Sequence, residues 1–504
     1  MQSLGKFLKA NKFRIILILI LILGAFFRFY RIRDYLTFLG DEGRDVLVVK
    51  RMIVDHKFTL LGPITSVGSM YMGPVFYYFM IPFLWLFNLD PVGPAVMVAL
   101  FSLATLYLVY RLGSEFFNRS VGLIASFLFA ISPLPITYAR SSWNPNIVPF
   151  FSLTTIYALL KAIVKKEFRW MIIVGLSLGI MIQLHYVSFM FFPIIVVSLL
   201  ITKTKIPIKY YLICLCSFIL SYSPFILFEL RHRFVNSYAV WNFLFQSKSD
   251  NAFWLSSFCH TTSDVLIRLF WRLVIIQNAE ITKFFLILIL IFFLLWWKTR
   301  NRYSIIQNKS LLIILCWLVI GLISFGIYQG LIYDYYLVPI WLLPFLIFSL
   351  LIVGIKKFLP YGKIISIIVL LFVIYFNLSH SPLKIPPSNL LKNTEIISKF
   401  VFEKTEGQSF NFALIAGKNS DHAYRYFLEI WGNPPTLIEN PQNDPERKTV
   451  KQRLFVVCEE KVCEPLGHPL WEIAGFGRAE VEYEWRVETA KVYQLRHFNN
   501  KIQK

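Results

Sequence analysis

A cluster of carboxylates near the N-terminus contains residues that could act as a general base. Asp41, Glu42 and Asp45 stand close together in the stretch 38–45, with Arg44 among them. Carboxylates crowded in this way repel one another, so one of them readily takes up a proton, as a general base must. The alternative is a solvated helix start in which Asp41 caps a helix over 42–54. The spacing alone does not separate the two interpretations.

The amino-acid composition indicates the class of protein that positions these residues. Of the 504 residues, 57% are apolar, 16% are charged and 49 are Phe. A water-soluble core cannot hide so much apolar surface, because the surface of a folded protein grows too fast with size. Soluble globular, disordered and disulfide-scaffold proteins are therefore excluded. The composition predicts a polytopic α-helical membrane protein.

Apolar segments of the right length predict about eleven transmembrane helices. A helix needs about 20 residues to cross the hydrocarbon of a bilayer. The predicted spans lie near 14–30, 92–110, 120–138, 147–163, 170–184, 187–202, 209–228, 282–297, 310–328, 334–353 and 363–379. The stretch 73–87 is also apolar, but it is short and contains Pro74 and Pro82. We expect it to be a juxtamembrane helix in the first outer loop.

The net charge of +22 serves as an orientation signal. Residues 384–504 are nearly neutral, with 17 basic and 16 acidic residues, so the excess lies among the spans. With 73–87 outside the membrane, the basic clusters fall in loops 111–119, 161–169, 203–209, 298–309 and 355–363, on one side of the membrane. The positive-inside rule makes that side cytoplasmic. No nucleic-acid partner is expected, and the protein is predicted to lie in the plasma membrane with its first span retained as an anchor.

The tail is predicted to be a separate extracytoplasmic domain. We expect a membrane domain over 1–380 and a small C-terminal α/β domain over 381–504, after a proline-containing linker. Strands are predicted at Asn411–Ile415, Arg453–Val457 and Trp485–Gln494, and a helix at Asp421–Trp431. Cys458 and Cys463 could form a disulfide in an oxidising compartment or remain free thiols.

The order of motifs over 1–380 resembles the C-type glycosyltransferases. It is most similar to glycosyltransferase family 39, which includes protein O-mannosyltransferases and the aminoarabinose transferase of lipid A. A first span precedes the Asp41-Glu42 pair, which leads a helix. Further motifs follow in the family's order: Gly73-Pro74-Val75-Phe76-Tyr77-Tyr78, Ser132-Pro133, Tyr138-Ala139-Arg140, Gln183-Leu184-His185-Tyr186 and Tyr335-Tyr336-Leu337-Val338-Pro339. The family usually has His or Lys where this chain has Gly73 before the proline, which leaves the role of that stretch open.

The resemblance implies transfer of a sugar from a polyprenyl-phosphate carrier to a lipid, glycan or protein acceptor on the outer membrane face. It implies an inverting displacement with Asp41 as general base. Glu42 would orient Asp41, contact the acceptor or help to hold a metal, while Asp45 shares the helix face and Arg44 pairs with a carboxylate. A lipid donor needs no nucleotide loop, and neither GxGxxG nor GxxxxGK[ST] occurs. Asp41, Glu42, His185 and His232 could supply metal ligands, but no spacing defines a site, so metal dependence stays open.

Several polar and aromatic residues near the outer ends of spans are candidates for substrate contact. Arginine suits a phosphate, so Arg140 and Arg231 with His232 are phosphate candidates, although Arg140 could instead reach lipid headgroups. A charged carboxylate such as Asp334 is costly in free energy at the membrane rim. We therefore expect Asp334 to have a function or to form an ion pair with Arg140 or Arg268. The remaining candidates could contact the sugar or serve as interfacial or structural residues: Tyr77, Tyr138, Trp143, Asn144, His185, Tyr186 and Tyr335.

A lipid-linked sugar flippase or another polytopic transporter is the alternative function. Such a protein would carry charged residues near the bilayer midplane and inverted repeats with broken helices. The predicted spans have few charges at their centres, and their polar clusters lie near the outer rim. A transferase is therefore the favoured interpretation.

Overall fold

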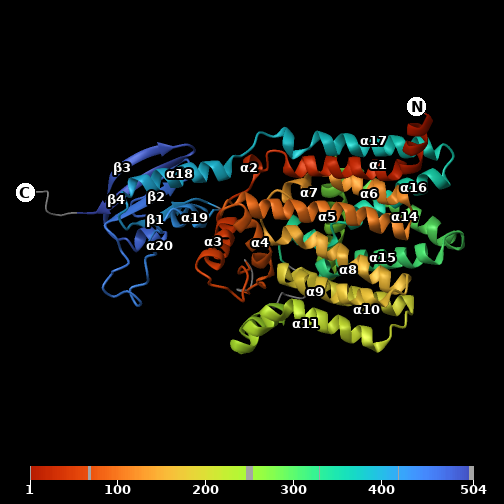
Figure 1. Ribbon diagram of the computed structural model, residues 1–504, viewed down its shortest axis with the longest axis horizontal. Helices are drawn as coiled ribbons and strands as arrows, with labels where there is room; N and C mark the ends of the chain where they lie inside the picture. Colours follow the sequence, from red (N-terminus) through yellow and green to blue (C-terminus); the bar gives the residue numbers. More distant parts are fainter. Residues whose placement is uncertain (1, 66–69, 246–253, 329, 418, 499–504) are drawn as a thin grey trace, which may run out of the picture. The chain divides into compact units, whose positions relative to one another are not determined.

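The computed structural model describes all residues except 1, 66–69, 246–253, 329, 418 and 499–504 (Figure 1). The chain forms two compact units. The first unit contains Met1–Tyr30, Phe58–Phe79 and Pro94–Pro386, and the second contains Arg31–Lys57, Met80–Gly93 and Pro387–Lys504. The carboxylate cluster around Asp41 thus belongs to the same unit as the C-terminal residues, and the last segment begins near the expected boundary at residue 380.

The first unit is a helical bundle in which every predicted span is helical. The corresponding helices are α1 (Gln2–Phe29), α5 (Val92–Phe116), α6 (Arg119–Ile131) with α7 (Pro133–Tyr138), α8 (Val148–Val164), α9 (Met171–Leu184), α10 (Phe191–Thr202), α11 (Ile208–Arg231), α14 (Ala279–Lys298), α15 (Ile305–Ile327), α16 (Leu343–Phe358) and α17 (Gly362–Ser379). The predicted juxtamembrane segment forms α4 (Val75–Leu86). Two helices, α12 (Val235–Phe245) and α13 (Trp254–Phe270), occupy a region expected to be a loop.

Length and composition support a multi-pass membrane protein. Among the described residues, six helices are long and apolar enough to cross a membrane, and a pair bent by 59°, Asp334–Ile340 with Leu343–Phe358, raises the number to seven. Four shorter apolar helices add Val75–Leu86, Arg119–Ile131, Phe168–Leu184 and Tyr186–Thr202. The polytopic class is confirmed, while the number of eleven spans stays a prediction.

Three of the loops predicted to share one side of the membrane meet in the structure. Lys161 Nζ lies 2.9 Å from Glu115 and 2.8 Å from Glu167, which joins loops 111–119 and 161–169. Gln307 donates from Nε2 to the Phe117 carbonyl at 3.1 Å, which adds the loop after α14. We refer to this end of the bundle as the basic end. The arrangement is the one that the sidedness prediction requires.

The second unit contains a four-stranded mixed sheet with the order β1-β2-β4-β3. β1 (Asn411–Ile415) pairs in parallel with β2 (Arg453–Cys458), and β4 (Ala490–His497) pairs antiparallel with β2 and with β3 (Ala479–Val487). The predicted strand Trp485–Gln494 is wrong, because it spans the tight turn between β3 and β4. The turn has only two residues, Glu488 and Thr489, and contains none of the Gly, Asn or Asp residues that usually mark a hairpin, so the sequence pattern conceals it.

Alternate residues of the strands build two cores, one on each face of the sheet. Helices α18 (Leu390–Lys404) and α19 (His422–Ile430) cover one face, where Ile397 and Leu428 pack against Phe412, Phe455 and Val492 (Figure 1). The other face contains Ala413, Val456, Leu495 and Ile473, the last from α20 (Trp471–Ala474). The unit also holds α2 (Ile32–Tyr35) and α3 (Gly40–Val54). The predicted small α/β domain is confirmed, and α18 is an addition to it.

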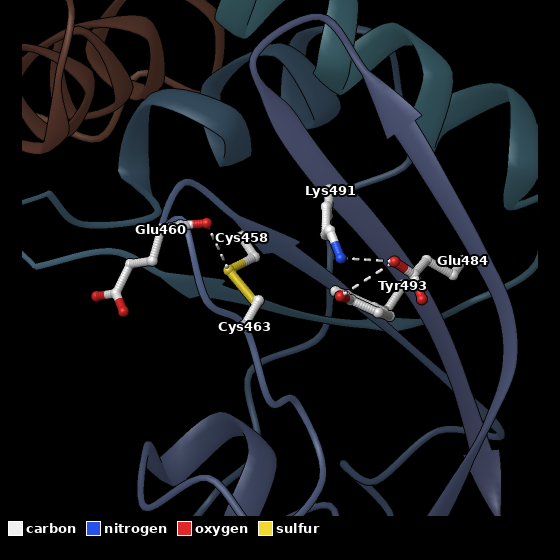
Figure 2. The surroundings of a disulfide bond; sticks show 6 residues. All are labelled: Cys458, Glu460, Cys463, Glu484, Lys491 and Tyr493. Carbon is white, nitrogen blue, oxygen red and sulfur yellow. Dashed lines mark hydrogen bonds and ion pairs between the residues drawn. A yellow bond between two sulfur atoms is a disulfide. The ribbon is translucent and has the colours of Figure 1, made fainter.

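A disulfide closes a short loop just after β2. Cys458, the last residue of the strand, is bonded to Cys463, and Cys458 is buried in the second core (Figure 2). Lys491 and Tyr493 of β4 lie nearby, and both contact Glu484 of β3. Disulfides persist in oxidising compartments, so the bond agrees with an extracytoplasmic location for this unit.

Loss of the disulfide should destabilise the second unit. The unfolded chain loses loop entropy when the bond is present, which corresponds to about 2 kcal/mol for so short a loop. Cys463→Ser should therefore lower the unfolding temperature of the purified full-length protein, measured by fluorescence without reductant. Cys259→Ser, at an exposed free cysteine, is the control. Equal unfolding temperatures for Cys463→Ser and wild type would contradict a stabilising bond.

Candidate active site

The carboxylate cluster lies on the first two turns of α3. The N-cap residue is Leu39, and Glu42 accepts a hydrogen bond from the Leu39 backbone N–H at 3.2 Å. Asp41 is therefore not the cap, although it does lie in the first turn of the helix, as that alternative expected. Glu42 and Asp45 are buried, whereas the Asp41 side chain is 54% exposed. Of the three carboxylates, Asp41 is the one that can meet an acceptor from solvent.

One guanidinium joins two of these carboxylates. Arg44 Nη1 lies 2.8 Å from Asp41 Oδ1, and Arg44 Nη2 lies 2.8 Å from Asp45 Oδ1. The shared partner offsets the repulsion between the carboxylates and limits the positions that Asp41 can adopt. The expected role of Arg44, pairing with a carboxylate, is observed. Asp41, Arg44 and Asp45 thus form one ion-pair network in which the Asp41 side chain is the exposed member.

Glycines allow α3 to lie directly against α19 within the second unit. A Cβ added at Gly40 would stand 1.9 Å from Ser420 Oγ, and a Cβ added at Gly43 would stand 2.3 Å from the Ala423 backbone nitrogen. The Gly40 N–H also donates to Asn419 Oδ1 at 2.9 Å. The glycines that flank Asp41 and Glu42 are thus required by packing. They fix the start of α3 on residues nearly 400 positions away in the sequence.

Ion pairs hold the other end of α3 on the same helix. Arg51 Nη2 lies 2.8 Å from Glu429 Oε2, and Lys50 Nζ lies 3.3 Å from Glu429 Oε1. Burial would raise the pKa of Glu429, but the hydrogen bonds and charges of Arg51 and Lys50 outweigh it and hold that pKa below its ordinary value. The charged form of Glu429 is therefore the one that holds α3 and α19 together.

In the first unit, a second group of predicted residues gathers at the helix ends opposite the basic end. Asp334 Oδ2 lies 3.1 Å from Arg272 Nε, and Asp334 Oδ1 lies 3.7 Å from Arg268 Nε. Tyr138 interacts electrostatically with Asp334 and Arg272. We call Arg268, Arg272, Asp334, Tyr138 and Tyr335 the arginine–tyrosine cluster. Asp334 thus has the ion pair with Arg268 that the sequence suggested, together with a second pair to Arg272.

Aromatic rings surround this cluster. The ring of Tyr335 lies 4.5 Å from Trp143 and 6.2 Å from His185, while Tyr138 lies 5.1 Å from Trp341. The predicted candidates Tyr138, Trp143, His185, Asp334 and Tyr335 are therefore brought together. Aromatic faces of this kind pack against sugar rings and lipid chains, and the arginines supply charge for a phosphate.

The backbone beneath the arginines departs from regular helix. Arg272 lies in a π-helical turn, Trp271–Ile275, which ends at Ile276 with a φ of 60°. Such a φ is strained for a β-branched residue, and π turns are frequent at functional sites. Ser132 and Asn377 donate to the Leu273 and Val274 carbonyls at 2.6 and 2.7 Å. The surrounding helices thus hold this turn in place.

Arg268 retains unused hydrogen-bonding capacity. Its Nε and Nη2 atoms are buried and make no hydrogen bond within the described part of the chain. Buried N–H groups without hydrogen bonds are costly, so these two atoms of the partly exposed Arg268 are suited to an anion with several acceptor oxygens. The sequence predicted Arg268 only as a partner of Asp334, and Arg272 was not predicted at all. Both arginines precede a helix break, in a region that was expected to be a loop. Their spacing of four residues on an amphipathic segment is the signal that could have found them.

Two other predicted candidates, Arg140 and Asn144, form hydrogen bonds to backbone carbonyls at helix ends. Arg140 is buried and donates to the Phe27 and Tyr30 carbonyls at 3.2 and 2.6 Å, so it caps the end of α1. Asn144 is buried and donates to the Leu184 carbonyl at 2.6 Å, at the end of α9. Backbone carbonyls thus take up donors of both side chains, which agrees with the structural alternative for Asn144. Substrate contact by either residue stays a prediction.

The second phosphate candidate is not assembled as expected. Glu229 accepts from the backbone N–H groups of Asn236 and Ser237 at 3.2 and 2.7 Å, and so faces the start of α12. His232 is exposed and stacks on Phe228 at 4.2 Å, and Arg231 is also exposed. Tyr186 accepts from Asn236 at 2.8 Å and donates to the Tyr71 carbonyl, while Tyr77 is buried in α4. No three His, Cys, Asp or Glu side chains of the described residues form a group that could hold a metal ion.

Comparison with known proteins agrees with this arrangement. Residues 72–228 match the family model described as dolichyl-phosphate-mannose-protein mannosyltransferase. No curated protein matches the chain. Among solved structures, ArnT from Cupriavidus metallidurans bound to undecaprenyl phosphate is similar over 96% of this chain and 98% of its own, with a TM-score of 0.62 and 13% identity. The oligosaccharyltransferase AglB from Archaeoglobus fulgidus, in complex with an inhibitory peptide and a dolichol-phosphate, is similar over 89% of this chain and 70% of its own, with a TM-score of 0.53 and 11% identity.

The chain therefore has the fold of the C-type membrane glycosyltransferases, with a small C-terminal sheet domain. Its resemblance to glycosyltransferase family 39, inferred from the motifs, is confirmed by the family match and by the ArnT-like fold. These findings support a transferase. The matched segment begins after the Asp41-Glu42 pair, so the assignment of that pair depends on the geometry of α3.

Replacing Gly43 with alanine should destabilise the contact between α3 and α19. Alanine usually stabilises a helix interior by about 1 kcal/mol relative to glycine. Here the added Cβ would meet the Ala423 backbone at 2.3 Å, and no side-chain rotation can relieve that clash. A net loss of about 1–3 kcal/mol is expected from overpacking.

Thermal unfolding of the full-length protein checks this expectation. Gly417→Ala, in the same unit, is the matched control, because its Cβ would meet nothing closer than 3.8 Å. If Gly43→Ala unfolds no more easily than Gly417→Ala, the close packing of α3 is disproved.

Proposed function

We propose that this protein is an integral-membrane glycosyltransferase that moves a sugar from a polyprenyl-phosphate carrier to a hydroxyl of an acceptor at the extracytoplasmic face. The observation that carries the proposal is the partly buried Arg268, whose Nε and Nη2 atoms are buried and make no hydrogen bond in the described residues. Arg272 shares its partner Asp334, and aromatic rings lie around both. Both structural neighbours named above contain a polyprenyl phosphate, which supports the same class of donor here. The acceptor is a lipid, glycan or protein.

The reaction assigns Asp41 the role of general base. The acceptor oxygen attacks the anomeric carbon and passes its proton to Asp41, while the bond from that carbon to the phosphate oxygen breaks. Polyprenyl phosphate leaves with the electron pair, and the configuration at the anomeric carbon inverts. Arg44 positions Asp41 through their ion pair. Asp41 later returns the proton to water.

The leaving phosphate needs cations rather than an acid. Its charge grows as the bond breaks, so fixed guanidinium groups stabilise the transition state more than the ground state. We assign this role to Arg268 and Arg272, with Asp334 holding both in place. Trp143 and Tyr335 are assigned to contacts with the sugar or the first isoprene units. A flippase would need no base such as Asp41, and Asp41 is the feature that separates the two functions.

Asp41→Asn should abolish transfer without unfolding the protein. General bases contribute about 10²–10⁴-fold to rate. Membranes containing the variant should lose at least about 10²-fold of their transfer from a radiolabelled polyprenyl-phosphate sugar. Asp34→Asn, which disturbs only a surface ion pair with Arg31, is the matched control. Undiminished transfer by Asp41→Asn would remove Asp41 from the role of base, and no transfer by wild type with any polyprenyl donor would favour the flippase.

Arg272→Ala should weaken use of the donor. A charge-assisted hydrogen bond contributes about 1.5–3 kcal/mol, so kcat/KM for the polyprenyl donor should fall about 10–100-fold. Arg272→Lys should recover part of this loss, because it keeps the charge but not the paired donors. Lys283→Ala, at an exposed pair with Glu280, is the control. A loss confined to the acceptor's KM would place the phosphate elsewhere.

A further inference from the structure

A pocket lies at the basic end of the first unit, and none of the residues that line it belongs to the candidate active site. It has a volume of about 160 Å³, far more than a single water requires. Its walls come from the ends of α14 and α16, the start of α15 and the turn between α5 and α6. Two cations line it, Arg302 and Lys357, together with Trp296, Tyr303 and Gln307. The pocket therefore combines positive charge with aromatic walls.

The segments around the pocket carry positive charge without any carboxylate. No Asp or Glu occurs in residues 281–333 or 335–394. Those ranges place seven cations at the basic end: Lys298, Arg300, Arg302, Lys309, Lys356, Lys357 and Lys363. Glu115, in the neighbouring loop 111–119, already binds Lys161, Arg111 and Tyr157. The segments around the pocket therefore carry an excess of positive charge that suits an anion from outside the chain.

The pocket wall is held firmly by its own contacts. Trp296 and Tyr303 stack at 3.8 Å with an angle of 8°, and Trp296 donates to Asn308 at 2.9 Å. Lys357 Nζ lies 3.9 Å from the centre of the Tyr303 ring, which fixes the cation on the aromatic face. The first turn of α15 faces the same region and adds the positive end of a helix dipole. An entering anion meets charges that are already positioned.

The surroundings fit a lipid better than a free ion. Exposed apolar side chains lie along α14 near the pocket, among them Ile291, Leu294 and Trp297. By the positive-inside rule this end lies at the cytoplasmic surface of the bilayer, where anionic headgroups are available. Basic pockets between transmembrane helices bind such headgroups. A lipid phosphate could enter the pocket while its acyl chains lie against α14.

We propose that this pocket binds the phosphodiester headgroup of an anionic phospholipid from the cytoplasmic leaflet. Arg302 and Lys357 contact the phosphate, and Trp296 and Tyr303 form the wall against the glycerol region. This site is separate from the polyprenyl phosphate assigned to Arg268 and Arg272. It can therefore be tested whether or not the transfer activity is found.

Native mass spectrometry of the full-length protein in detergent tests the proposal. Wild type should retain phosphatidylglycerol in preference to phosphatidylcholine. The double variant Arg302→Ala/Lys357→Ala should lose at least tenfold in apparent affinity for phosphatidylglycerol. Arg300→Ala/Lys363→Ala, which removes the same charge from the same end without touching the pocket lining, should stay within twofold of wild type. Matching unfolding temperatures show that the variants fold, and Arg302→Gln/Lys357→Gln replaces the alanine pair if they do not.

The other outcomes each overturn the assignment. Equal losses in the two double variants would mean general attraction to the basic surface rather than a site. Equal retention of phosphatidylcholine would remove the role of charge. Displacement of the lipid by millimolar inorganic phosphate would indicate a site for free phosphate, and preference for undecaprenyl phosphate over phosphatidylglycerol would indicate a second carrier site.

Discussion

The first unit depends on one constraint, namely that backbone polar groups in hydrocarbon must find partners inside the protein. Regular helices meet it within themselves, but every break releases carbonyls that side chains must satisfy. Arg140 serves the end of α1, Asn144 serves the end of α9, and Ser132 with Asn377 serves the π turn after α13. Much of the polar chemistry of this unit is thus used to make its broken helices stable.

The same constraint separates structural from functional polar residues. Arg140 and Asn144 resemble substrate ligands in the sequence, because they lie near the outer rim beside aromatic residues. Their donors are directed to backbone carbonyls, so little remains for a substrate. Arg268 is paired with Asp264 and Asp334 rather than with backbone carbonyls, and two of its nitrogen atoms are buried without hydrogen bonds in the described residues. The distinction lies in what surrounds each guanidinium, which a single sequence does not record.

Hydropathy predicted the fold well where the membrane dictates it. Each expected span is helical, and 73–87 is a short helix, because length and apolar content suffice for both. Helix α13 was missed because one of its faces is polar and it lies between long apolar segments. In the C-terminal region, the turn between β3 and β4 was missed because only Glu488 and Thr489 separate the apolar positions of the two strands and no Gly, Pro, Asn or Asp marks it. The site was predicted in part: Asp41 and Asp334 carry signals of their own, whereas Arg272 gains its meaning from a fold in which Asp334 lies 3.1 Å away.

The packing of α3 changes how the C-terminal residues should be regarded. If the C-terminal residues formed an independent domain, their removal would leave the carboxylate motif intact. Here Gly40 packs against Ser420, just before α19, and Gly43 packs against Ala423 of α19. Glu42 bonds to the start of its own helix, and Lys50 and Arg51 form ion pairs with Glu429 of α19. The glycines beside Asp41 and Glu42 thus record a packing requirement as well as a motif. The start of α3 therefore takes its rigidity from side-chain packing and ion pairs with α19, in contrast to the helix breaks of the first unit, where side chains satisfy backbone carbonyls.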